Sequence, residues 1–280
     1  MRCTPWLLVL AIGLGAAGGV RADFELPILY PVQKTLVVAE EIGSDELTRL
    51  GRIDNAMVEV QMSAGNMMRD VLLQQLNRSF AGATKRVYLQ GRLKPVHVEQ
   101  LGRLERLEVA YRPGESGLDD ETFNALYQLG PTRKLIHLAS APDPSLLQRV
   151  GKLKFFVPVV HLSAGPPSEA LLRWLRSRPD CSVWFVLPAG FPPQGIYDLC
   201  QFRPLHLLLQ TRRNRLEKDL LNVVKDLRKV EVTVVVDGRL TVADVKQLIA
   251  LERFSLRVVL GQPPRYTPGL SRLLNRIEPP

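Results

Sequence analysis

The sequence predicts an α/β fold, an αβ-solenoid of about ten parallel strand–helix units, with a closed (β/α) barrel as the alternative. Two observations lead to this prediction. The segment at 87–107 recurs at 234–254 with ten of its 21 residues identical, and the copies lie 147 residues apart, three times 49. Short β-branched runs also alternate with helical patterns, which is typical of parallel strands covered on both faces.

Ten short runs rich in strand-forming residues are each bounded by turn residues and followed by a helical pattern. They predict strands at 35–39, 58–62, 86–90, 107–111, 134–138, 155–160, 182–187, 205–209, 231–236 and 256–260.

Apolar positions at the ends of the predicted helices recur at the same period. Leu101, Val150, Leu199 and Leu248 are each 49 residues apart, and the first unit fits at an offset of 51. Spacings of three and four residues place such positions on one helix face, which must be buried by neighbouring units. Residues 35–280 are therefore predicted to form a single domain of about five copies of a double repeat.

Two segments resemble the leucine-rich repeat family. Leu101, Leu104, Leu107 and Val109 follow its L-x-x-L-x-x-L-x-L pattern, and residues 117–126 are similar to the helical side of the longer, ribonuclease-inhibitor-type repeat. This resemblance implies an open horseshoe with a concave sheet face that binds protein partners or extended polymers.

Strand number also favours the horseshoe over the barrel. A (β/α)₈ barrel closes at eight strands and typically uses ~250 residues. Here ten strands are predicted in the 258 residues that follow position 22. The shortest strand-to-strand steps leave little length for a barrel helix.

The first 22 residues have the pattern of a signal peptide. Arg2 precedes an apolar stretch at 6–19, and Val20 and Ala22 supply the small residues of a cleavage site. The alternative is an uncleaved anchor, but the apolar run is short for a membrane span. We expect an exported protein, periplasmic or secreted, with an extended lead-in at 23–34 and no later segment able to cross a bilayer.

The chain is basic, with a formal net charge of +9, or +7 once Arg2 and Arg21 are removed with the leader. Such a charge favours anionic lipid headgroups, acidic polymers or acidic proteins, although it also confers solubility alone. The densest cluster is Arg212, Arg213 and Arg215, which is less than a nucleic-acid-binding stripe requires. No specific nucleic-acid partner is predicted.

Cys181 and Cys200 remain after the leader. In an oxidising compartment they could form a disulfide, and the alternative is two buried thiols. The absence of a nearby histidine pair argues against a zinc site.

Polar residues at the carboxyl ends of the predicted strands are where a barrel would place its active site. They are Glu40, Glu41, Arg92, Tyr111, Arg112, His161, Arg212, Asp237 and Arg239. A hydrolase would use paired carboxylates, but acids are few at these ends and arginines outnumber them. Most of these residues are therefore interpreted as solvated turn residues.

Histidines offer a second possible chemistry. His137 and His161 are 24 residues apart and so belong to adjacent strands, where they could share a metal ion. The apolar neighbours of His137 favour a hydrogen-bonded structural histidine instead, and His206 has the same interpretation. His97 is expected to be exposed. No metal or other cofactor is predicted.

The predicted function is non-enzymatic binding of a protein or extended polymer on a repeat-built concave surface. The predicted contact residues are Arg92, Tyr111, Arg112, His161, Gln210 and Arg239. Arg92 and Arg239 each follow a glycine at equivalent positions of two copies, and an arginine there either binds an anion or bonds a turn carbonyl. The alternative function is an exported, barrel-like hydrolase acting on a carbohydrate.

Overall fold

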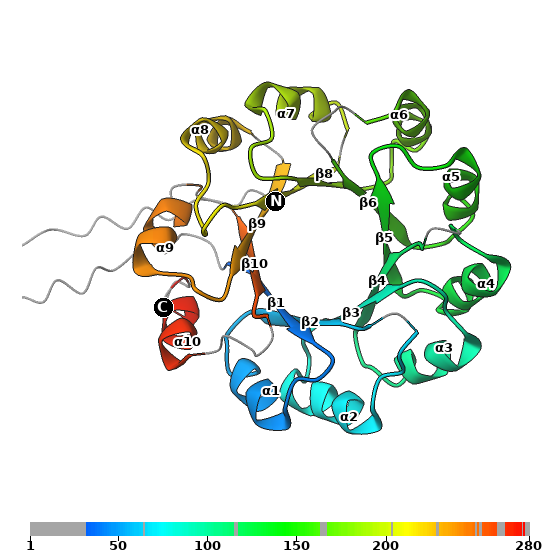
Figure 1. The fold of residues 1–280 in the computed structure, drawn as a ribbon, viewed down its shortest axis with the longest axis horizontal. Helices are drawn as coiled ribbons and strands as arrows, with labels where there is room; N and C mark the ends of the chain where they lie inside the picture. Colours follow the sequence, from blue (N-terminus) through cyan, green and yellow to red (C-terminus); the bar gives the residue numbers. More distant parts are fainter. Residues whose placement is uncertain are drawn as a thin grey trace, which may run out of the picture.

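The described part of the chain is a closed ring of ten parallel strands with ten helices outside it, as Figure 1 shows down the barrel axis. The computed structural model describes residues 32–63, 65–114, 117–162, 167–202, 204–227, 230–249, 251, 254–261, 267–275 and 277. The predicted signal peptide lies outside these residues, as does most of the predicted lead-in.

All ten predicted strands are confirmed, with bounds within two residues of those expected. They are β1 (Lys34–Ala39), β2 (Ala56–Gln61), β3 (Lys85–Gln90), β4 (Leu107–Arg112), β5 (Arg133–Ala139), β6 (Phe156–His161), β7 (Val183–Leu187), β8 (Leu205–Gln210), β9 (Val230–Asp237) and β10 (Ser255–Val259).

Each strand is followed by a short helix. These are α1 (Ser44–Leu50), α2 (Asp70–Ser79), α3 (Pro95–Leu101), α4 (Asp120–Gln128), α5 (Pro144–Val150), α6 (Glu169–Arg176), α7 (Pro193–Leu199), α8 (Lys218–Asp226), α9 (Val242–Ile249) and α10 (Pro268–Asn275).

The ring closes between β1 and β10, so the prediction of an open solenoid was wrong and its barrel alternative is confirmed. Lys34 pairs with Leu256 in parallel register, Leu256 N donates to Gln33 O at 2.9 Å, and Leu260 N donates to Val37 O at 3.1 Å. A solenoid would leave both outer strands with unpaired backbone groups. Here the rotation between successive units returns the tenth strand to the first, and those groups bond each other.

The double repeat is visible in the turns that precede the even-numbered strands. Asn55, Arg106 and Phe155 all have positive φ angles, of 50°, 52° and 54°. Their carbonyls accept from a lysine N–H near the start of the preceding strand, as when Lys34 N donates to Asn55 O at 3.1 Å. Helices within one double unit also pack together, α1 with α2, α3 with α4, α5 with α6 and α7 with α8.

Helix starts follow local sequence signals. Asp119 caps α4 by accepting from Thr122 N at 2.7 Å, and Ser168 caps α6 by accepting from Leu171 N at 3.3 Å. Proline occupies the first turn of α3, α5 and α7, where no backbone N–H is required. Asp120 and Glu121 lie in the first turn of α4, where the helix dipole favours acidic side chains.

Two separate apolar clusters lie on the two faces of the sheet. The larger one fills the space between strands and helices. The smaller one lies inside the ring and contains Ala110, Leu135, Val157, Val159, Trp184, Val186 and Leu208. An eight-stranded barrel is just wide enough to be filled by ordinary side chains. Ten strands enclose more space, and here long polar and aromatic side chains fill the remainder.

No helix within the described ranges is both long and apolar enough to cross a membrane.

Candidate functional site

The carboxyl ends of the ten strands meet at one end of the barrel, which we call the carboxyl mouth, because all the strands are parallel. Strand side chains alternate between the two faces of the sheet. Ile136, Leu138 and Val160 belong to the outer core, so His137 and His161 face the barrel interior. Barrel proteins place binding and catalytic groups at this end.

The two histidines contact each other directly. His137 Nδ1 and His161 Nε2 are 2.7 Å apart, and Tyr88 packs edge-on against His137 with ring centroids 5.1 Å apart. Their predicted placement on adjacent strands is confirmed. Burial, followed by the charges of Arg112 and Arg257, lowers the pKa of His161 to about 4. Burial first and then His161 and the nearby arginines lower the pKa of His137 well below its usual value.

Because both imidazoles are neutral near pH 7, one of them donates to the other. If the shared proton is on His161 Nε2, the outer nitrogen of His137, Nε2, carries a proton and donates, while the outer nitrogen of His161, Nδ1, accepts. In the opposite pair of tautomers, His137 Nε2 accepts and His161 Nδ1 donates. The pair therefore offers one donor and one acceptor at its outer nitrogens. No group of three or more histidine, cysteine or acidic residues in the described ranges is placed to hold a metal ion.

Arg112 supplies an exposed positive charge beside this pair. It ends β4, its register partner on β3 is Gln90, and no carboxylate in the described part of the chain forms an ion pair with it. Arg257 differs, since its Nη2 donates to Glu59 Oε1 at 2.5 Å. Arg112 is thus a cation of the carboxyl mouth that is available to a ligand.

Below the mouth, a chain of alternating charges crosses the barrel interior. Glu59, only 2% exposed, binds both Arg257 and Arg86, the latter through a contact of 3.4 Å. Arg86 also binds Glu108 at 2.8 Å, and Glu108 binds Arg133 at 3.4 Å. The two arginines keep the pKa of Glu59 below its usual value although burial raises it. The chain holds three arginines and two glutamates, and each of them has a partner of opposite charge.

Two predicted contact residues do not face the barrel interior. Tyr111 is 1% exposed, belongs to the core between sheet and helices, and donates its hydroxyl to Gly91 O at 2.6 Å. Arg92 is exposed on the rim, where its Nε lies 3.3 Å from Asp119 and 3.0 Å from Glu121. Both therefore have structural partners rather than an opening toward the interior.

Gln210 and Arg239 are exposed at the carboxyl ends of β8 and β9. They lie on a different part of the rim from Arg112 and His161, which end β4 and β6. Gly91, before Arg92, has the expected positive φ of 79°, whereas Gly238, before Arg239, is not among the described residues with positive φ.

Cys181 and Cys200 are half-buried, and each is present as a thiol. The Cys181 Sγ lies 3.8 Å from Phe156 O, and burial raises the pKa of this thiol.

The acids predicted at strand ends separate into two places. Glu40 and Glu41 line a pocket of about 280 Å³ beside β1 and β2, where Glu40 accepts from Asn66 Nδ2 at 2.7 Å. Asp237 ends β9 and accepts from Asn214 Nδ2 at 2.9 Å. Glu59 and Glu108, deeper in the barrel, are neutralised by arginines.

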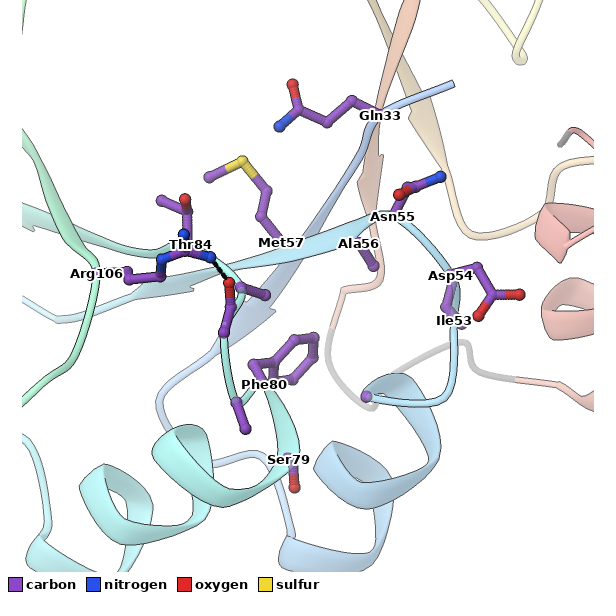
Figure 2. Close-up of a pocket in the computed structure, with 14 residues that line it drawn as sticks. Gln33, Ile53, Asp54, Asn55, Ala56, Met57, Ser79, Phe80, Thr84 and Arg106 are labelled. Carbon is purple, nitrogen blue, oxygen red and sulfur yellow. Dashed lines mark hydrogen bonds between the residues drawn. The ribbon is translucent and has the colours of Figure 1, made fainter. Parts of the chain in front are cut away.

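A larger pocket of about 580 Å³ opens at the opposite, amino-terminal end of the barrel (Figure 2). It is lined mostly by backbone and small polar groups at the ends of α1 and α2, including Asn55, Ser79 and Thr84. Carbonyls at helix carboxyl ends attract cations, and Arg106 already donates to Gly82 O across this pocket. None of the predicted contact residues lines it.

His97 is buried rather than exposed, at 6%, because its Nδ1 accepts from Lys94 N at 2.9 Å at the start of α3. His206 is buried as expected, with Nε2 2.6 Å from Thr233 Oγ1.

Glu59, Arg86 and Arg257 were not predicted as a group. Glu59 and Arg257 each lie between two apolar residues of their strand, which is the pattern of a polar side chain on the inner face, whereas Arg86 follows Lys85.

Neither family models nor curated proteins match this chain. The resemblance to leucine-rich repeats therefore stays a prediction.

Proposed function

We propose that this chain is a binding protein whose carboxyl mouth takes an anionic group, a carboxylate or a phosphate, of a protein or polymer ligand. One observation carries this proposal. Arg112 is exposed beside two histidines held neutral in a positive field, and no described carboxylate pairs with it. Arginine binds carboxylates and phosphates through two parallel hydrogen bonds, and a neutral imidazole N–H adds a third donor.

Two of the predicted contact residues belong to this site, but the surface that carries them differs from the predicted one. Arg112 and His161 lie near each other at the mouth of a closed barrel, instead of along the inner face of a horseshoe. The net positive charge of the chain would attract anionic ligands. Export remains part of the proposal, on the strength of the predicted leader.

A second candidate is the carbohydrate hydrolase. Closure into a barrel supports it, as does the pocket that Glu40 and Glu41 line at the carboxyl end. The buried carboxylates of Glu59 and Glu108 do not support it, because arginines hold both in place.

Calorimetric titration with inorganic phosphate and with acetate tests the first proposal. Arg112→Ala combined with His161→Ala should weaken binding at least tenfold, since each charge-assisted hydrogen bond contributes ~1.5–3 kcal/mol. Arg52→Ala, which removes an exposed arginine between α1 and β2, is the matched control and should bind like wild type.

Equal affinity in the double variant and the wild type would contradict the site assignment. Glycan cleavage that is lost in Glu40→Gln or Glu41→Gln would support the hydrolase in its place.

A further inference from the structure

A tight turn on the rim of the carboxyl mouth presents an arginine in an unfavourable backbone conformation. Arg212 N donates to Arg215 O at 3.2 Å, and Arg215 N donates to Arg212 O at 2.9 Å. Between them Arg213 and Asn214 have φ angles of 48° and 62°. This geometry usually takes Asn-Gly, and a left-handed conformation costs an arginine about 1–2 kcal/mol.

Asn214 holds this turn in place. It is only 4% exposed; its Nδ2 donates to Asp237 Oδ1 at 2.9 Å, and its Oδ1 accepts from Asp237 N at 2.7 Å. Asp237 Oδ1 also accepts from Arg239 N at 2.8 Å. The turn after β8 and the loop after β9 are thus fixed to each other at the end of β9.

The side chains displayed by this assembly are cationic. Arg213 and Arg239 are exposed, and neither forms an ion pair with a described acid. Arg212 and Arg215 have only long contacts with acids, 4.0 Å to Glu217 and 3.7 Å to Asp244. When a buried side chain holds a strained turn in place, the strain points to a functional role for the side chains that the turn exposes. We call Arg213 and Arg239 the arginine rim.

The arginine rim lies across the barrel from Arg112. The ring order places β9 and β4 on opposite sides, as Figure 1 shows, and both strands end at the carboxyl mouth. A ligand with one anionic group can contact one side of the mouth. A ligand with many anionic groups along a chain can contact both.

We propose that the natural ligand is an extended polyanion, which binds Arg112 and His161 with one anionic group and the arginine rim with others. This inference rests on the proposed anion site and adds a second, independent contact. Linking two weak contacts in one ligand raises the overall affinity well above that of either contact alone.

The test compares inorganic phosphate with long-chain polyphosphate, and with polyglutamate to separate phosphate from carboxylate polymers. Arg213→Glu combined with Arg239→Glu should leave phosphate affinity unchanged and reduce affinity for the preferred polyanion at least tenfold. Arg49→Glu combined with Arg52→Glu makes the same charge change on α1 and the turn that follows it, and should cost less than threefold.

The outcomes separate the two proposals. If phosphate does not bind the wild type, the anion site itself fails. If phosphate binds but neither polymer binds more tightly, or if both double variants weaken polymer binding equally, the arginine rim fails, because the attraction is then diffuse and screened by salt.

Discussion

At the scale of single residues, the barrel interior shows how a wide ring is filled without unpaired charge. Glu59 is buried yet ionised, because Arg257 and Arg86 both contact it. Removing one member of such a group typically costs 3–5 kcal/mol, since its partners are left charged and buried. The histidine pair adds no buried charge to the interior, because both imidazoles remain neutral.

This neutrality predicts how stability depends on pH. Histidines titrate near ~6.5 in an unfolded chain, whereas the pKa of His161 in the folded protein is about 4. Between these values the unfolded chain binds more protons, so the free energy of unfolding should fall as pH is lowered from 7 to 5. His161→Gln should reduce this fall by on the order of 1 kcal/mol, discounted for partial exposure.

Urea denaturation of both proteins at several pH values measures this effect. Parallel curves for wild type and His161→Gln would show that the pair does not govern stability in this range. Carboxylates with lowered pKa, such as Glu59, act in the same direction but at lower pH.

At the scale of the repeating element, a lysine recurs near the amino end of a strand. Lys34 and Lys85 begin β1 and β3, and Lys134 is the second residue of β5; at the same 49-residue spacing the next two copies carry Val183 and Val232. Lys134 Nζ donates to Gly130 O and Thr132 O at 2.8 Å and to Lys154 O at 3.2 Å. Lys85 Nζ is equally buried but has no hydrogen-bond partner in the described part of the chain.

The two lysines should therefore respond in opposite ways to a substitution that conserves volume. Lys85→Met should stabilise the fold by ~1–2 kcal/mol, since it removes a buried and unpaired ammonium group. Lys134→Met should destabilise it by ~1–3 kcal/mol, because three carbonyls lose their donor. Thermal and urea unfolding of the two variants measure both effects, and destabilisation by both would contradict this account of Lys85.

At the scale of the whole molecule, the double repeat and the ten strands were predictable, and closure was not. Local patterns define each strand, and the 49-residue period defines their order. Closure depends on the accumulated rotation of ten units, which no single segment reveals. Glu59 and Arg257 lie 198 residues apart and meet only because the ring closes.

The candidate site was predictable to the same extent. Adjacent-strand spacing brought His137 and His161 together, and position at a strand end identified Arg112 and His161. Tyr111 ends the predicted strand at 107–111, but the pleat turns its side chain outward into the core. The arginine rim could not be predicted as a unit, because Asn214 and Asp237 join two separate loops.

The most direct test of the anion-binding mouth is an NMR titration of isotope-labelled protein with pyrophosphate. It locates the ligand without assuming a site. An anion-binding mouth predicts the largest chemical-shift changes at Arg112, His137 and His161. Changes confined to the pocket beside Glu40 and Glu41, or to the amino-terminal pocket of Figure 2, would contradict it, as would a spectrum that does not change.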